Sequence, residues 1–305
     1  MRSFLLIVAF LVFMASMDLY TLRGLRIMGL FPAGGPKLPQ LIYWGIHLWL
    51  FAAMVWAGIR FQNQREPSVF LAVTVIMGLF LMLYLPKLLF NLGQLAADLT
   101  SVGIRLVNSL SGNGQRAVSV RNWFLFPGAA MGLLLMISIA WGMLHGRTHV
   151  KIFREEVRIS RLPEQLSGLR IVQLSDLHLA GFYRDPGYIE KVVERVNGLD
   201  PHMICFTGDL VHNFAEEAEP FTGILSEMKA PLGKYAVLGN HDYGTYYRWD
   251  SGQEMQENLA RVKDQFRAAG FDLLLNEHRK VEQDGGVIEV VGVENWGKPP
   301  FPQRG

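Results

Sequence analysis

The first half of the chain consists of long apolar runs separated by short polar stretches. A helix that crosses a bilayer needs about 20 mostly apolar residues, and four runs before residue 145 approach or reach that length. They occupy residues 4–17, 41–59, 69–89 and 124–144. The pattern predicts an N-terminal α-helical membrane domain of about four transmembrane helices.

The first apolar run has a second interpretation as a secretory signal peptide. No small-residue cleavage site follows it, and Asp18, Tyr20 and Arg23 come directly after its apolar core. Three further apolar runs then follow along the chain. We therefore expect the first run to be retained as a membrane helix.

Few polar residues interrupt these runs. Asp18 and Lys87 lie near segment ends, where a long side chain reaches the interface. His47 lies within the second run and is expected to pack between helices, so a transport function has little support. Residues 91–122 are mixed in polarity and are expected to form a loop with an interfacial helix.

After residue 147 the pattern changes to short elements. Apolar residues between 150 and 159 indicate strands that lead away from the membrane. Further strands are predicted at 169–174, 203–206, 235–238, 273–275, 278–282 and 287–291, with helices at 188–196, 221–228 and 255–269. Strands that alternate with helices indicate a layered α/β sheet.

Composition agrees with a membrane half and a water-exposed half. Half of the residues are hydrophobic and 18% are charged, whereas a typical soluble domain has about 25% charged residues. The net charge of +2 gives no indication of nucleic acid binding. The single cysteine, Cys205, cannot form an intrachain disulfide and is expected to be an inert core residue.

Three successive predicted strands of the second half each run into a loop that carries polar side chains. The first loop contains Asp176 and His178, and the second contains Asp209. The third contains Asn240, His241 and Asp242. Because ligands in α/β sheets bind beyond the carboxyl ends of strands, we expect the three loops to converge on one site.

The residue types in these loops are those of a metal site. Asp176 and His178 are two positions apart, so both side chains lie on the same side of an extended stretch. A carboxylate beside an imidazole suits Fe, Mn or Zn better than Mg or Ca. Each motif alone is also explained by surface polarity, a turn or a capped loop. Their order, each at a strand end, favours a shared site over three coincidences.

The pattern Asp176-x-His178, Gly208-Asp209 and Gly239-Asn240-His241-Asp242 resembles the calcineurin-like metallophosphoesterase superfamily. The membrane segments and the sequence from Ser175 to Leu179 are similar to its bacterial membrane-associated branch, the YkuE/YaeI-like phosphoesterases. The resemblance covers about residues 169–296. It implies a β-sandwich flanked by helices around two divalent metal ions, with Mn, Fe or Zn as the candidates.

The resemblance also implies a role for each residue of the motif. Asp176 and His178 would bind the first metal, Asp209 would bridge both metals, and Asn240 would bind the second. His241 would protonate the leaving-group oxygen or stabilise the transition state, and Asp242 would orient it. A metal-activated water would then attack phosphorus in line, without a covalent enzyme intermediate.

The sequence departs from the family pattern after residue 278. The family has further ligands there, namely a histidine and a Gly-His-x-His loop, but no histidine follows His278 in this chain. We therefore expect a phosphoesterase domain that is truncated at its C-terminus. The alternative function is a degenerate, non-catalytic phosphoesterase-like membrane protein with a binding or assembly role.

These observations predict three regions: a transmembrane helical anchor at 1–146, a linker with strands at 147–168, and a partial calcineurin-like phosphoesterase domain at 169–305. The expected activity is hydrolysis of phosphomonoesters or phosphodiesters, with a lipid or envelope-linked phosphate ester as the substrate. The expected location is a bacterial cell membrane. Basic residues are divided evenly between the two sides and do not orient the helices; by resemblance, the catalytic domain is extracytoplasmic.

Overall fold

The computed structural model describes residues 2–31, 34–61, 65–110, 120–183 and 185–297, without the side chains of residues 2–8. Residues 111–119 of the expected loop at 91–122 and the last residues of the expected 169–305 domain therefore lie outside the described residues. The chain divides into two compact units. The first comprises residues 1–60 and 73–149, and the second comprises residues 61–72 and 150–305.

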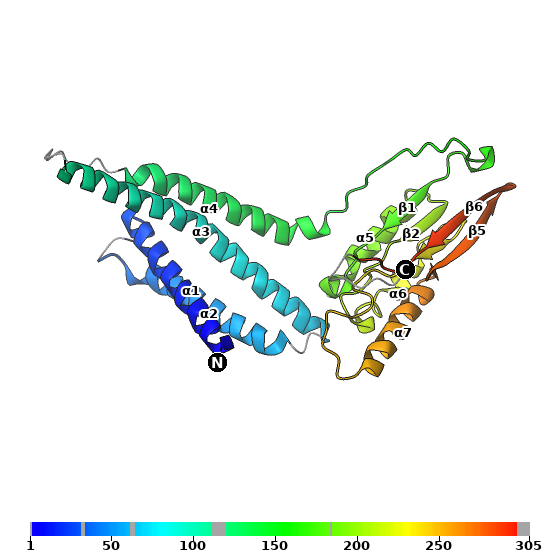
Figure 1. Ribbon diagram of the computed structural model, residues 1–305, viewed down its shortest axis with the longest axis horizontal. Helices are drawn as coiled ribbons and strands as arrows, with labels where there is room; N and C mark the ends of the chain where they lie inside the picture. The colour runs from blue at the N-terminus through cyan, green and yellow to red at the C-terminus, as the bar shows by residue number, and fades with distance from the viewer. Residues whose placement is uncertain (1, 32–33, 62–64, 111–119, 184, 298–305) are drawn as a thin grey trace. The chain divides into compact units, whose positions relative to one another are not determined.

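The first unit is all-helical (Figure 1). Its helices are α1 (Arg2–Ile27), α2 (Lys37–Arg60), most of α3 (Pro67–Leu110) and α4 (Arg121–Leu144). Among the described residues, α2, α3 and a span that begins with α4 are long and apolar enough to cross a membrane. Large apolar side chains, such as Leu48 and Leu134, point outward from these helices, as expected for a surface that contacts lipid.

The third helix corrects the first part of the expected loop with an interfacial helix at residues 91–122. It continues unbroken to Leu110, for a total of 44 residues. Glycines let α3 and α4 approach closely, because a Cβ atom at Gly93 would lie 2.9 Å from the carbonyl oxygen of Phe124. This contact stabilises a helical stretch whose mixed composition does not specify a helix on its own.

Buried charges of the first unit are paired with one another. The Asp18 carboxylate of α1 accepts hydrogen bonds from Lys87 Nζ at 2.6 Å and from the Tyr84 hydroxyl at 2.9 Å. His47 of α2 also contacts the Lys87 ammonium. The polar residues of the membrane helices therefore connect α1, α2 and α3.

The stretch between the two halves contains no strands among its described residues, which corrects the strands expected at 150–159. It has only two 3₁₀ turns, η2 (Gly146–Thr148) and η3 (Glu164–Leu166). Phe153 and Val157 are 81% and 76% exposed. Their alternation has no neighbouring strand to pair with, and a strand needs such a partner.

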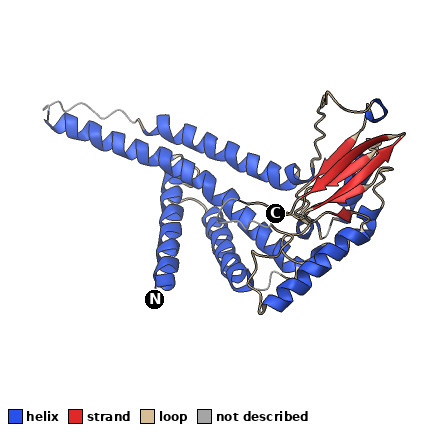
Figure 2. Cartoon of the chain, turned by 45° about the vertical axis from the view of Figure 1, so that its right-hand side comes forward, coloured by secondary structure: helices blue, strands red, loops and turns tan. Residues whose placement is uncertain are grey.

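A four-stranded parallel sheet forms the centre of the second unit (Figure 2). Its strands are β1 (Ile171–Leu174), β2 (Met203–Phe206), β3 (Lys234–Ala236) and β4 (Asp272–Leu273), in that spatial order. The intervening helices are α5 (Pro186–Asn197), α6 (Thr222–Ser226) and α7 (Gly252–Ala268), with 3₁₀ turns η4 (Leu179–Phe182) and η5 (Ala215–Glu217). These elements confirm the predicted α/β alternation.

The strand order places all three crossovers on the same face of the sheet. A parallel crossover is almost always right-handed, so an order that never reverses brings every helix to one side. Ile204 and Phe206 of β2 are fully buried there against Val193 of α5 and Phe266 of α7. The packed core thus fixes the strands, and all their carboxyl ends open at one edge.

An antiparallel hairpin follows the sheet. Its strands, β5 (Glu277–Gln283) and β6 (Gly286–Gly292), pair with Gln283 opposite Gly286. Asp284 and Gly285 connect them with positive φ angles of 51° and 84°. Two central residues with positive φ suit the right-handed twist of a tight hairpin, which explains the Asp-Gly pair.

Candidate metal centre

The loops after β1, β2 and β3 meet at the carboxyl edge of the parallel sheet, as predicted. Backbone hydrogen bonds join the first loop to the second: Asp176 N–H donates to Gly208 O at 3.0 Å, and His178 N–H donates to Asp209 O at 3.1 Å. The third loop is joined to the second because His241 N–H donates to Asp209 Oδ1 at 2.9 Å. Each candidate residue is therefore held by a neighbouring loop.

Two glycines make this close approach possible. Gly208 has a φ of 95°, and a Cβ atom there would lie 2.0 Å from the backbone nitrogen of Gly239. A Cβ atom on Gly239 would lie 2.1 Å from Asp209 Oδ1. Any side chain at either position would force the second and third loops apart.

The buried side chain of Asp242 connects the second and third loops through hydrogen bonds. Its fully buried carboxylate accepts hydrogen bonds from the backbone N–H groups of Asp209 at 2.8 Å, Leu210 at 2.9 Å and Gly239 at 2.9 Å. Burial raises the pKa of Asp242 to about 7, and these N–H donors act in the opposite direction. The residue organises the backbone on which the other side chains stand.

This position differs from the expectation that Asp242 orients the ring of His241. The ring Nδ1 instead lies 2.9 Å from the carbonyl oxygen of His212. Because a carbonyl only accepts, Nδ1 donates and carries the proton, which leaves Nε2 free of that hydrogen atom. The ring also stacks on Tyr246, with 4.5 Å between ring centres.

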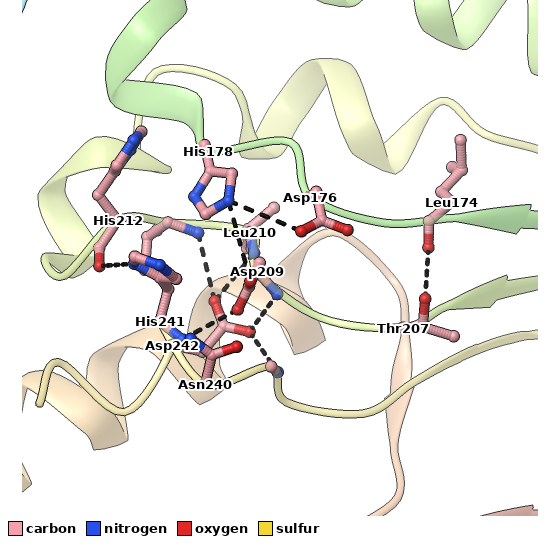
Figure 3. Close-up of polar contacts among 12 residues, drawn as sticks. Leu174, Asp176, His178, Thr207, Asp209, Leu210, His212, Asn240, His241 and Asp242 are labelled. Atoms are coloured by element: carbon pink, nitrogen blue, oxygen red, sulfur yellow. Dashed lines mark hydrogen bonds and ion pairs between the residues drawn. The ribbon is translucent and has the colours of Figure 1, made fainter. Parts of the chain in front are cut away.

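The candidate metal ligands gather around Asp209 (Figure 3). His178, Asp209 and His241 each offer a ligand atom, and these atoms all lie within 4.8 Å of one another. His178 Nε2 lies 3.8 Å from Asp176 Oδ1 and 3.8 Å from Asp209 Oδ2. The structure thus brings together residues from all three predicted loops.

Asn240 lies in the third loop, next to His241. Its amide nitrogen donates to the hydroxyl of Tyr246 at 2.7 Å. That orientation leaves the amide oxygen as the atom available to a hard cation. The role of Asn240 as a ligand stays a prediction.

The backbone of the site is strained. Asp176, His178 and Asp209 have φ angles of 56°, 44° and 59°, which is the left-handed region that residues other than glycine seldom adopt. Such conformations cost about 1–3 kcal/mol each and cluster at functional sites. All three strained residues here are candidate ligands.

The donor set fits a divalent cation. His178 Nδ1 is buried without a hydrogen-bond partner. Burial lowers the pKa of His178 and the neighbouring His212 lowers it further, which favours the neutral imidazole that binds metals. Two carboxylates, two imidazoles and an amide oxygen together match Mn, Fe or Zn.

The structure brings one further residue, His212, next to the site. The sequence motif does not include it. The ring of His212 packs at a tilt against that of His178, with 4.5 Å between ring centres. Its backbone N–H donates to Glu217 Oε2 at 2.6 Å, which holds the end of the second loop. Its position three residues after Asp209 was the available signal.

Comparison with known proteins identifies both parts of the chain. Residues 1–147 match the family described as "Probable Calcineurin-like phosphoesterase, transmembrane domain", and residues 169–304 match "Calcineurin-like phosphoesterase". The chain therefore belongs to the calcineurin-like metallophosphoesterases that carry an N-terminal transmembrane domain. It is an integral membrane protein of a hydrolase family.

Three curated relatives illustrate the range of the family. UDP-2,3-diacylglucosamine pyrophosphatase LpxG of Chlamydia muridarum is 35% identical over 133 residues, which are 42% of this chain and 40% of the relative. A "transmembrane protein with metallophosphoesterase domain" from Danio rerio is 28% identical over 293 residues, 92% of this chain and 59% of the relative. Metallophosphoesterase YkuE of Bacillus subtilis is 28% identical over 150 residues, 48% of each protein. The chain thus spans less than two thirds of each of these relatives, and no solved structure matches it.

Proposed function

We propose that the protein is a membrane-anchored, metal-dependent phosphoesterase that hydrolyses phosphomonoester or phosphodiester bonds. The observation that carries the proposal is the convergence of His178, Asp209 and His241, whose ligand atoms lie within 4.8 Å of one another. They come from three different strand-end loops. The membership of the chain in a metallophosphoesterase family supports the same activity.

We assign the ligands in two sets. Asp176 and His178 would hold a first divalent cation, Asn240 would hold a second, and Asp209 would bridge both because it lies between the other two loops. Two cations so held neutralise phosphoryl oxygens and lower the pKa of a bound water.

The chain's own side chains prepare proton transfer. His241 Nδ1 is fixed by the carbonyl of His212, so Nε2 is the ring atom left to take up a proton, and the resulting imidazolium would give that proton to the leaving-group oxygen. Stacking on Tyr246 holds the plane of the ring. Asp242 contributes indirectly, because its hydrogen bonds keep the second and third loops in contact.

The substrate we propose is an amphiphilic phosphate ester of the cell envelope. The relative LpxG is named as a pyrophosphatase of UDP-2,3-diacylglucosamine, a molecule with acyl chains. The helices of the first unit hold this chain in a membrane. We propose a bacterial cell membrane as its location and an extracytoplasmic position for the catalytic domain.

We retain the proposed regions 1–146, 147–168 and 169–305 as sequence domains, with one structural addition. Residues 61–72 belong to the compact unit that contains the candidate site. A catalytic domain expressed from residue 147 onward would therefore lack a piece of its own unit.

Hydrolysis of bis(p-nitrophenyl) phosphate by the full chain in detergent, with and without Mn²⁺, tests the function. We expect metal-dependent hydrolysis that Asp176→Asn abolishes. Asp264→Asn is a matched control, because Asp264 is an exposed residue of α7 that pairs with Arg267. Binding of the phosphate ester without metal-dependent hydrolysis would instead establish the alternative, a non-catalytic phosphoesterase-like protein.

A further inference from the structure

Residues 61–72 follow α2 in the sequence and include the start of α3, but they belong to the unit of the metal centre. Arg65 attaches this segment: its Nη1 donates to Glu254 Oε1 at 2.6 Å and its Nη2 donates to Glu216 Oε1 at 3.3 Å. The guanidinium also lies 5.7 Å from the ring centre of Trp249. Two ion pairs and a cation–π contact at Arg65 hold residues 61–72 against the rest of the second unit, which contains the candidate site.

Five residues further on, Phe70 contacts the histidines of the site. Its ring centre lies 4.4 Å from that of His212, and His212 lies 4.5 Å from His178. His178 in turn lies 4.8 Å from His241. Figure 3 shows His212 and Asp176 on opposite sides of His178. Phe70 is thus the outer member of a row of rings that ends on two candidate site residues.

Within the described part of the chain, no hydrogen bond fixes the Nδ1 side of the His212 ring. Its Nδ1 is buried without a partner, and the Glu217 carboxylate lies 3.7 Å away. That carboxylate already accepts from the backbone N–H groups of His212, Asn213 and Phe214. The orientation of the imidazole therefore depends on the rings on either side of it.

We propose that Phe70 is a positioning residue of the metal centre, which holds the ring of His212 against His178, and that Arg65 keeps Phe70 in place. His178 carries a candidate ligand atom, so a shift of His212 displaces that ligand. The first turn of α3, a helix able to cross the membrane, thereby forms part of the support of the site. The catalytic consequence rests on the proposed function, whereas the effect on metal binding does not.

The first test compares two identical substitutions in the full chain. Phe70→Leu removes the ring contact with His212, and Phe61→Leu makes the same change at a residue that is 58% exposed. We expect Phe70→Leu to weaken Mn²⁺ binding about tenfold, as is typical for residues that support a metal ligand, and Phe61→Leu to leave it unchanged. Mn²⁺ affinity by calorimetry within twofold of wild type in Phe70→Leu would overturn the proposal.

A double-mutant cycle separates positioning from a general effect on the fold. If Phe70 acts through His212, Phe70→Leu should have no further effect on Mn²⁺ affinity in a His212→Ala background. If the two losses simply add, Phe70 does not act through His212 and the proposal is wrong. Circular dichroism on all four proteins confirms that they are compared in the folded state.

The attachment by Arg65 is tested with one variant that removes the positive charge and one that retains it. Arg65→Met should weaken Mn²⁺ binding in the same direction as Phe70→Leu, and Arg65→Lys should restore part of it because one ion pair remains possible. Arg195→Met, on the exposed face of α5, is the control and should have no effect. Equal affinities in Arg65→Met and wild type would remove Arg65 from the proposal.

Failure of this proposal and failure of the proposed function are distinguishable. If the wild-type chain binds Mn²⁺ but hydrolyses no phosphate ester, the proposed function fails, and the metal-affinity measurements still decide the role of Phe70. If hydrolysis occurs and Phe70→Leu changes neither Mn²⁺ affinity nor kcat/KM, the function stands and the positioning role is wrong.

Discussion

The polar clusters of the two units are compensated in different ways. In the membrane unit, Asp18 is paired with Lys87 and hydrogen-bonded to Tyr84, so its charge is compensated within the protein. In the catalytic unit, Asp176 and Asp209 face imidazoles, and among the described residues neither forms an ion pair with a lysine or arginine. The buried Nδ1 atoms of His178 and His212 also lack partners.

The polar cluster of the membrane unit holds helices together, whereas the polar cluster of the second unit has donor atoms available for a ligand. A buried charge is tolerated only when an opposite charge and hydrogen bonds compensate it. In the membrane cluster, formed by Asp18, Tyr84 and Lys87, the opposite charge and the hydrogen bonds come from the protein itself. The cluster of the second unit combines carboxylates, imidazoles and a strained backbone, a donor set that a divalent cation would complete.

The largest expected effect comes from the residue at the centre of the catalytic cluster. Asp209→Asn removes the charge that we place between two cations, and kcat/KM for bis(p-nitrophenyl) phosphate should fall about 1,000-fold, or about 4 kcal/mol of transition-state stabilisation. Asp264→Asn should be unchanged. Equal activity in both variants would show that the cluster does not take part in hydrolysis.

The second effect tests the membrane cluster. Lys87→Met leaves Asp18 buried without its cation, which typically costs about 3–5 kcal/mol of stability. The melting temperature in detergent should fall clearly, while hydrolysis by the folded fraction stays within twofold of wild type. The double variant Asp18→Leu/Lys87→Met should recover much of the loss; a double variant as unstable as Lys87→Met would contradict the pairing.

A smaller effect is expected from the backbone that carries the site. Gly208→Ala places a methyl group against Gly239 N in a backbone conformation with positive φ, at a cost of about 1–3 kcal/mol. We expect a lower melting temperature together with weaker Mn²⁺ binding. Gly223→Ala, where a Cβ atom would meet nothing within 4 Å, is the control. Unchanged metal affinity in Gly208→Ala would mean that the loops separate without consequence.

The smallest effect concerns pH and the attachment of residues 61–72. Burial raises the pKa of Glu216, but its backbone hydrogen bond and the nearby Arg261 and Arg65 outweigh burial, so the pKa lies below its ordinary value of 4.5. A lowered carboxyl pKa contributes stability that is complete above 4.5 and is lost as the pH falls through the folded-state pKa. The stability difference between wild type and Glu216→Gln should therefore stay constant from pH 7 to 5 and shrink only below 4.5. A difference that shrinks between pH 7 and 5 would contradict the ion pairs.

The sequence was sufficient for the parts of the fold that depend on local pattern and connectivity. Asp176, Asp209 and Asn240 each follow a short apolar strand, and parallel pairing alone brings such loops to one edge. The alternation of strands and helices after residue 169 was readable for the same reason. Their meeting required no information about individual contacts.

The remaining features depend on contacts between distant segments, which a local pattern does not encode. The hydrogen bond from His241 to the His212 carbonyl replaces the expected pairing with Asp242, because the buried Asp242 is occupied by backbone donors. Phe70 looked like the start of a membrane helix, and only its ring contact with His212 assigns it to the site. The strands expected at 150–159 do not form, because alternating apolar and polar residues do not by themselves provide a neighbouring strand to pair with.

Mn²⁺ binding to the full chain in detergent, measured by calorimetry and electron paramagnetic resonance, tests the contrast between the two clusters most directly. We expect binding that Asp209→Asn abolishes and that Lys87→Met leaves intact in folded protein. Binding that survives in Asp209→Asn, or that depends on Lys87, would show that the converging loops are not the metal centre.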